Sequence, residues 1–267
     1  MNKLHLAATS LADAAPVDFI RATAEAGFDG IGIRLHRSPV YPNWHPILGD
    51  AALMGAVKSE LASSGLEFLD IFTFYVQSEM DWETMEAAIA FGAELGASWV
   101  QSIGDDPEWS RMRDSFGRLC DLAGRYGLGV TLEAPVNSRV VNSMPKAVQL
   151  IADCGRENMA IVLDPGQFHQ AGHTPDVLHR LPARLFPYAQ FNDVLPDRGG
   201  RCAPGAGEVP LAAILDELPA ELPLSLEWGP PRGSDYTPAE WAKHAMAGAR
   251  AFLHGYDTSR PAPTSLG

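Results

Sequence analysis

The stretch AIVLDPG at residues 160–166 is a short apolar run that ends in a carboxylate, Asp164. Three other stretches repeat this pattern: VTLEAP at 130–135, YAQFND at 188–193 and LSLEWG at 224–229. The oxygen-bearing side chains that end the four runs are those of Glu133, Asp164, Gln190 and Glu227. Short apolar runs are typical of parallel strands that helices cover. The sequence therefore predicts four buried strands, each followed by a polar side chain.

The spacing of these residues favours a closed barrel. Between Glu133 and Asp164 the separation is 31 residues (164 − 133), and the next two intervals are 26 (190 − 164) and 37 (227 − 190). One βα unit of a barrel has about 31 residues. Four earlier strand candidates alternate with helical stretches and lie near Leu4, Ile31, Leu69 and Val100. No Gly-rich GxGxxG turn follows the first of them, which argues against an open nucleotide-binding sheet.

The chain has 267 residues, close to the typical length of one such barrel. We therefore predict an α/β fold consisting of a single (β/α)₈ TIM barrel over residues 1–255. A Pro/Ser/Thr-rich segment at 256–267 is expected to form a loose C-terminal tail. In such a barrel the C-terminal ends of the strands meet at one mouth, where barrel enzymes carry their active sites.

Three carboxylates at the ends of apolar strands are costly to bury unless a cation neutralises them. A divalent metal ion does this, and hard cations such as Mg²⁺ and Mn²⁺ prefer oxygen ligands. We therefore predict one divalent metal ion as cofactor, with Mn²⁺ or Mg²⁺ favoured, held by Glu133, Asp164, Gln190 and Glu227.

The chain resembles the xylose isomerase-like superfamily of TIM barrels, the sugar phosphate isomerase/epimerase group. The motifs that carry the resemblance include GFDGIGI (27–33), TLEAP (131–135), LDPGQFHQAG (163–172), QFNDV (190–194) and LSLEW (224–228). In this family Glu, Asp, His and Glu from the last four strands bind one metal ion. The resemblance implies the same role for Glu133, Asp164, Gln190 and Glu227, with glutamine where the family usually has histidine. Some 3-dehydroshikimate dehydratases of the superfamily are similar in having glutamine there.

The resemblance implies a metal-dependent isomerase or epimerase of a small sugar, ketose or keto-polyol. Glu133 and Glu227 would act as acid and base around a metal-stabilised enediolate. A lyase of the same family is the alternative, either 3-dehydroshikimate dehydratase-like or a 3-keto-sugar eliminase. A non-catalytic partner subunit is a second alternative. The sequence leaves these three functions open.

Candidate contacts to a small polyhydroxylated carbonyl substrate lie in the loops that follow the strands. They are His36, Arg139, Gln167, His169, Asp193, Arg198 and Arg201. Histidine often stands in the family at the position of Gln167, three residues after Asp164, so a contact known from that histidine does not transfer directly. Asp193 is expected to orient a metal ligand.

The bulk composition excludes several partners. The net charge is −13, with 20 Lys plus Arg against 33 Asp plus Glu, so nucleic acid is not expected as a partner. No apolar run reaches the length of a membrane span, and the N-terminus does not read as a signal peptide. Three widely spaced cysteines indicate free thiols in a reducing compartment, so we expect a cytoplasmic protein. The resemblance leaves a homo-oligomer open.

Overall fold

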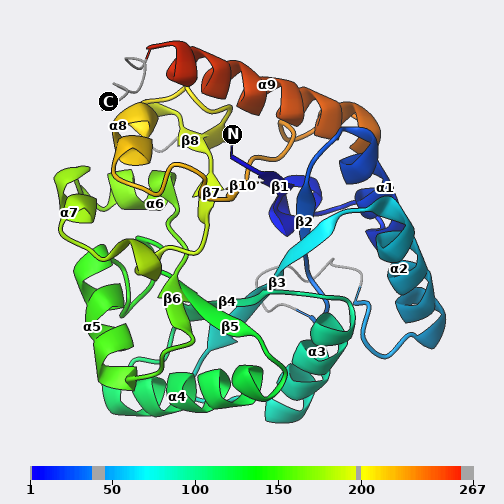
Figure 1. The fold of residues 1–267 in the computed structure, drawn as a ribbon. Coiled ribbons are helices and arrows are strands. Elements are labelled where there is room, and N and C mark those ends of the chain that lie inside the picture. The colour runs from blue at the N-terminus through cyan, green and yellow to red at the C-terminus, as the bar shows by residue number, and fades with distance from the viewer. Residues whose placement is uncertain (1, 38–45, 197–199, 260–267) are drawn as a thin grey trace, which may run out of the picture.

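The structure, a computed structural model, describes residues 2–37, 46–196 and 200–259. Eight parallel strands form one sheet that curls into a barrel (Figure 1). These strands are β1 (Leu4–Leu6), β2 (Gly30–Ile33), β3 (Glu67–Val76), β4 (Trp99–Gly104), β5 (Gly129–Glu133), β6 (Met159–Ile161), β7 (Ala189–Phe191) and β10 (Leu224–Leu226). Neighbours in the sheet follow the order β6-β5-β4-β3-β2-β1-β10-β7. The single (β/α)₈ barrel predicted from the sequence is therefore confirmed.

The ring closes between β6 and β7. A parallel bridge pairs Leu163 with Ala189, and the Gln190 amide donates to the Leu163 carbonyl oxygen at 2.8 Å. This bridge lies just beyond the end of β6, next to two of the predicted metal ligands. Closure of the ring brings the ends of β5, β6, β7 and β10 to one side of the mouth.

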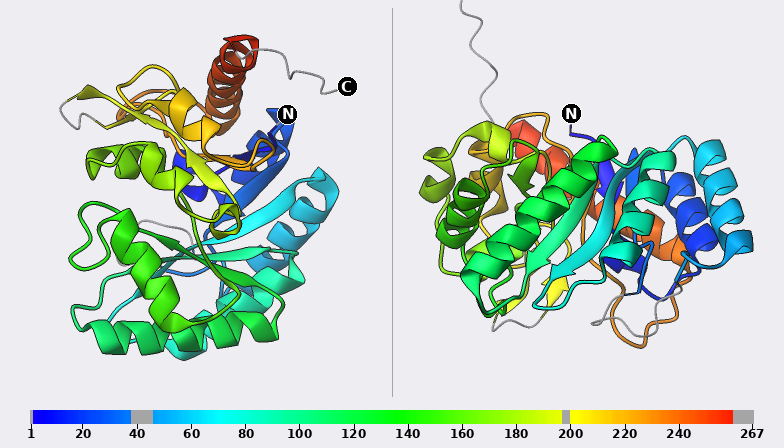
Figure 2. Two further views of the ribbon diagram at one scale, coloured as in Figure 1. Left: turned by 60° about the vertical axis from the view of Figure 1, so that its left-hand side comes forward. Right: turned by 90° about the horizontal axis from the view of Figure 1, so that it is seen from below.

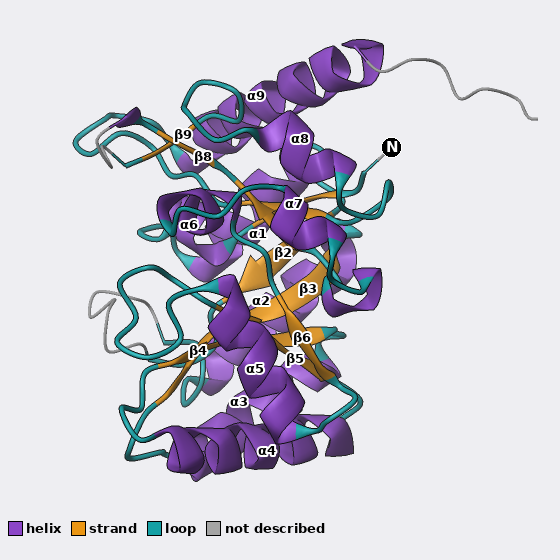
Figure 3. Ribbon diagram, turned by 90° about the vertical axis from the view of Figure 1, so that its left-hand side faces the viewer, coloured by secondary structure: helices purple, strands orange, loops and turns teal. Residues whose placement is uncertain are grey.

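Helices surround the strands, as the two views of Figure 2 and the view of Figure 3 show. They are α1 (Pro16–Glu25), α2 (Ala51–Ser64), α3 (Trp82–Glu94), α4 (Trp109–Arg125), α5 (Met144–Cys154), α6 (Pro165–Gln170), α7 (Asp176–His179), α8 (Leu211–Asp216) and α9 (Pro238–Ser259). Their apolar sides and the outward-facing strand residues form one continuous core that includes Ile31, Val100, Phe116, Leu132 and Trp241. This packing explains why the strands read as unbroken apolar runs.

One further strand pair lies outside the barrel. The strands β8 (Asp193–Val194) and β9 (Arg201–Cys202) pair antiparallel between β7 and α8. No repeat in the sequence indicated this short hairpin. It carries Arg201 toward the mouth.

The last helix, α9, begins with a capping box. The Glu240 amide donates to Thr237 Oγ1 at 3.3 Å, and the Thr237 amide donates to Glu240 Oε2 at 2.9 Å. The helix continues to Ser259, and Tyr256 is buried with its hydroxyl on Asp216. The expected end of the domain at residue 255 thus falls inside this helix, while 260–267 lie outside the described residues. No helix that the structure describes has the length and apolar composition needed to cross a membrane.

Candidate active site at the barrel mouth

The side chains of Glu133, Asp164, Gln190 and Glu227 come from four neighbouring strand ends. Glu133 is the last residue of β5, Asp164 precedes α6, Gln190 lies in β7 and Glu227 follows β10. Because β10 lies next to β7 in the sheet, the four residues follow one arc of the mouth, with the two glutamates at its ends. All four are buried, none more than 5% exposed.

Hydrogen bonds fix the orientation of the two glutamates. Gln101 Nε2 on β4 donates to Glu133 Oε2 at 2.8 Å. Thr9 Oγ1, in the short 3-10 helix Ala8–Leu11 that follows β1, donates to Glu227 Oε1 at 2.9 Å. Glu133 is therefore held from the neighbouring strand β4, and Glu227 from the 3-10 helix that follows the neighbouring strand β1. One oxygen of each carboxylate is left for other partners.

Asp164 caps the helix that follows it. Its Oδ1 accepts from the Gln167 amide at 3.0 Å and from Asn192 Nδ2 at 3.1 Å. The Asp-Pro pair starts α6 because the carboxylate satisfies a free helix amide and proline fits the first turn. The second oxygen, Oδ2, faces away from this cap and takes a different partner.

That partner is Arg201, whose guanidinium bridges two of the carboxylates. Its Nη2 donates to Asp164 Oδ2 at 2.5 Å, and its Nη1 lies 3.0 Å from Glu227 Oε1. The sequence predicted Arg201 as a substrate contact and gave no sign of this bridge. The position of Arg201 depends on the β8–β9 hairpin, and no repeated pattern in the sequence indicates that hairpin.

Burial and the proximity of these charges shift the pKa values of Glu133, Glu227 and Arg201. Burial, followed by the charges of Glu227 and Asp164, raises the pKa of Glu133 well above its ordinary range, against the opposing effect of Arg201. Burial raises the pKa of Glu227 to about 7, although Arg201 opposes this rise. Burial lowers the pKa of Arg201, but the carboxylates of Glu227, Asp164 and Glu133 outweigh it and raise that pKa.

Several buried oxygen and nitrogen atoms at this site have no hydrogen-bond partner. They are Gln190 Oε1, Gln190 Nε2, Glu227 Oε2 and Asn192 Oδ1. A buried polar atom without a partner is costly, so such atoms at a site call for a ligand or an ion. In the part of the chain that the structure describes, no three His, Cys, Asp or Glu side chains are gathered as a ready metal site.

Asp193 is bound to the backbone rather than to any of these side chains. Its Oδ1 accepts from the amides of Val194 (2.8 Å) and Val209 (2.9 Å), and its Oδ2 accepts from Gly205 and Gly207 (both 3.0 Å). A Cβ at Gly207 would lie 2.3 Å from Asp193 Oδ1, which explains the glycine. Asp193 therefore organises the segment after the β8–β9 hairpin. The expectation that it orients a metal ligand directly has no contact in support.

The remaining predicted contacts differ in their surroundings. The Gln167 side-chain oxygen accepts from the Val136 amide at 2.9 Å and so joins α6 to the loop after β5. His169 Nε2 lies 3.6 Å from Glu208. The exposed Arg139 pairs with Asp105 at 3.2 Å. Arg198 lies outside the described residues.

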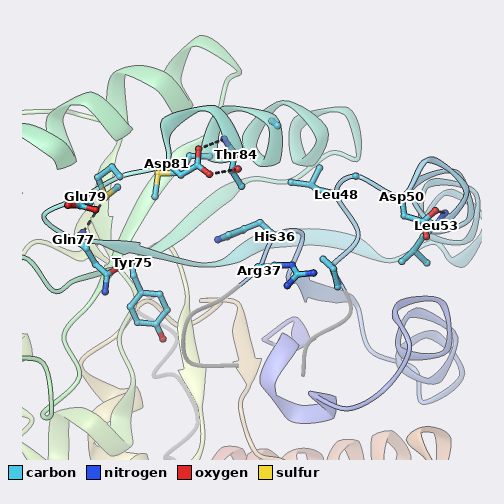
Figure 4. A pocket seen from close by; sticks show the side chains of 15 residues that line it. His36, Arg37, Leu48, Asp50, Leu53, Tyr75, Gln77, Glu79, Asp81 and Thr84 are labelled. Carbon is cyan, nitrogen blue, oxygen red and sulfur yellow. Dashed lines mark hydrogen bonds between the residues drawn. The ribbon is translucent and has the colours of Figure 1, made fainter. Parts of the chain in front are cut away.

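His36 lines a cavity of about 1010 Å³ at the ends of β2 and β3, whose lining includes none of the four strand-end residues (Figure 4). Its ring packs on Phe74 with centroids 4.4 Å apart, and it is buried. Burial, reinforced by the charge of Arg34, lowers the pKa of His36 to about 4, so its ring is neutral at pH 7. Tyr75 and Gln77 also line this cavity.

A protein-family model described as the xylose isomerase-like TIM barrel matches residues 20–252. The chain belongs to this family. No curated protein sequence matches the chain. Several solved structures are similar to this chain. A xylose isomerase-like TIM barrel/4-hydroxyphenylpyruvate dioxygenase fusion protein has a TM-score of 0.77 at 20% identity, over 98% of this chain, which spans 45% of that protein.

Three other solved structures match this chain over nearly their whole lengths. An IolI protein with a bound zinc atom has a TM-score of 0.75 at 18% identity, covering 97% of this chain and 99% of that one. The probable 3-DHS dehydratase AsbF of Bacillus anthracis has a TM-score of 0.73 at 17% identity, covering 92% of this chain and 97% of that one. An L-ribulose 3-epimerase has a TM-score of 0.70 at 19% identity, covering 98% of this chain and 99% of that one. At these identities the likeness establishes the fold.

Inside this xylose isomerase-like barrel, a buried hydrogen-bonded chain joins β3, β5 and the start of β7. The Tyr188 hydroxyl donates to Asp70 Oδ2 at 2.6 Å and lies 3.1 Å from Thr131 Oγ1. Gly32 leaves the necessary space, because a Cβ there would lie 2.2 Å from Asp70 Oδ1. Burial raises the pKa of Asp70 to about 6, and the hydrogen bond from Tyr188 opposes this rise.

We expect Asp70→Asn to stabilise the protein at neutral pH. The unfolded chain releases the Asp70 proton near pH 3.8, whereas the folded protein keeps it to about pH 6. Folding therefore weakens as pH rises from about 4 to 6, by up to about 3 kcal/mol. Melting temperatures of both proteins should coincide near pH 4 and separate by pH 7, with the variant higher. Parallel curves across this range would contradict the prediction.

Proposed function

We propose that this chain is a divalent-metal-dependent isomerase or epimerase of a small sugar, ketose or keto-polyol. The observation that carries the proposal is the pair of buried glutamates, Glu133 and Glu227, at the two ends of one arc of oxygen-bearing side chains. Membership of the xylose isomerase-like family and the likeness to an L-ribulose 3-epimerase support it.

The residues present fit a divalent ion by their chemistry. Glu133, Asp164, Gln190 and Glu227 would hold it, and buried Gln190 Oε1 and Glu227 Oε2 have no other partner. The similar IolI structure contains zinc, but an all-oxygen ligand set favours Mn²⁺ or Mg²⁺ here. When bound, the ion would supply positive charge that polarises a substrate carbonyl and stabilises negative charge on its oxygen.

The protein itself would move the proton. In the metal-free protein, burial raises the pKa of Glu133 and raises that of Glu227 to about 7, and a bound cation would lower both. A carboxyl group with a pKa near the working pH serves well as a general acid or base. One glutamate would remove the proton next to the carbonyl, and the other, from the opposite end of the arc, would return one.

The cavity beside β2 and β3 would accommodate the far end of the substrate. Tyr75 pairs in register with Ile103, and Ile103 pairs with Glu133, so β4 alone separates Tyr75 from Glu133 in the sheet. Two strand spacings separate them, about 10 Å. Polar groups such as those of His36 and Gln77 suit the hydroxyls of a polyhydroxylated carbonyl compound.

A lyase is the second candidate. Gln190 is in the place where the family usually has histidine, as in some dehydratases of the superfamily, and the probable 3-DHS dehydratase AsbF has a similar fold. A lyase would share the removal of a proton next to the carbonyl and would then expel a hydroxyl group from the neighbouring carbon.

The test is incubation in D₂O with a panel of ketoses and 3-dehydroshikimate after chelation and reloading with Mn²⁺ or Mg²⁺. We expect metal-dependent deuterium incorporation next to the carbonyl, read by NMR, together with a rearranged sugar. A new ultraviolet-absorbing unsaturated product would establish the lyase instead. Metal binding without exchange or product on any of these compounds would leave the non-catalytic partner subunit.

A further inference from the structure

Arg201 lies where the proposed function requires a divalent cation to bind. Its two terminal nitrogens reach two of the proposed ligands, Asp164 and Glu227, whose side chains are only 1% and 4% exposed. The Arg201 side chain is itself 30% exposed. The contact is thus between a partly exposed side chain and two carboxylates that are almost fully buried.

Charge neutralisation explains this arrangement. Burial, followed by the charges of Glu227 and Asp164, raises the pKa of Glu133, so these three buried carboxylates are unstable together without a cation. The guanidinium fork meets Asp164 and Glu227 with separate nitrogens, which the single ammonium of a lysine does less well. It leaves Gln190 Oε1 and Glu227 Oε2 without partners. The bridge therefore compensates the charge but does not complete the site.

The position of Arg201 can change with little disruption of the barrel. Arg201 lies on β9, which pairs with β8 through two residue pairs outside the eight-stranded sheet. Its side chain is long and reaches the carboxylates from outside the ring, whereas Asp164 and Glu227 are fixed by Asn192 and Thr9. The Arg201 guanidinium can therefore move, whereas the carboxylates of Asp164 and Glu227 are held in place.

We propose that Arg201 and a divalent metal ion compete for Asp164 and Glu227, so that the guanidinium neutralises the site without metal and withdraws when the ion binds. This inference rests on the proposed function for the identity of the metal ligands. It assigns Arg201 a role in the metal-free protein that is separate from any contact with substrate.

Arg201→Met tests the proposal through metal affinity and metal-free stability, without an activity assay. We expect the variant to bind Mn²⁺ at least about tenfold more tightly than wild type, measured by titration of the Mn²⁺ EPR signal. After chelation its melting temperature should be lower by about 5 °C or more, because two buried carboxylates lose their cation. Arg201→Lys keeps the positive charge but not the two separate nitrogens of the guanidinium. Its Mn²⁺ affinity and its melting temperature should lie between those of wild type and Arg201→Met.

Arg111→Met is the matched control. Arg111 also forms two hydrogen bonds with a buried carboxylate, Asp106, at 2.6 and 2.7 Å, but outside this site. It should lower the melting temperature and leave Mn²⁺ affinity unchanged. Equal Mn²⁺ affinity in wild type and Arg201→Met would overturn the competition and leave the proposed metal site intact. Absence of Mn²⁺ binding in both would overturn the metal site itself, and the competition with it.

Discussion

Replacing Glu227 by glutamine is expected to lower kcat by about 10²–10⁴-fold on whichever substrate the screen identifies, the range that a positioned acid or base contributes. Glutamine keeps the side-chain length and an oxygen that accepts from Thr9, but it cannot exchange a proton at neutral pH. Glu133→Gln should have an effect of the same order, because proton removal and return need both groups. Steady-state kinetics on metal-loaded protein measures both.

Glu86→Gln controls for the loss of a carboxylate as such. Glu86 lies on α3, outside the barrel, where its carboxylate pairs with Arg125 at 3.3 Å. It should keep the wild-type kcat, and circular dichroism should show that all three variants are folded. A rate near that of wild type in either site variant would exclude the two-glutamate mechanism, whatever the metal content.

The sequence was sufficient for the barrel because strand ends recur at intervals near one βα unit. The same regularity explains why Glu133, Asp164, Gln190 and Glu227 follow one arc of the mouth. Each residue occupies an equivalent place in its own unit, so fold and clustering come from a single pattern. Their role as metal ligands stays a prediction.

Contacts that break this regularity could not be predicted. Asp70 and Tyr188 are 118 positions apart and meet only through closure of the barrel, with Gly32 providing space. Arg201 reaches Asp164 through a short hairpin inserted after β7, where strand periodicity is too brief to detect. The sequence identified Arg201 as a mouth residue but could not indicate which atoms it meets.

Asp193→Ala should cause one of the largest losses of stability in the molecule. The carboxylate is fully buried and accepts four backbone amide hydrogen bonds, which tie β8 to residues 205–209. An unsatisfied buried donor costs about 1–3 kcal/mol, and alanine offers these amides no acceptor. We expect a loss of roughly 4 kcal/mol or more, or about 10 °C in melting temperature for a chain of this size.

Asp193→Asn refines this prediction, because it keeps one acceptor oxygen and places an amide NH₂ donor where the other oxygen accepted from two backbone amides. Its melting temperature should lie between those of wild type and Asp193→Ala. Asp121→Ala is the surface control, since Asp121 pairs with Arg156 at 2.7 Å on the exposed side of α4 and should cost no more than about 1 kcal/mol. If Asp193→Ala melted within about 2 °C of wild type, the carboxylate would not be what holds the hairpin, and Arg201 would need another support.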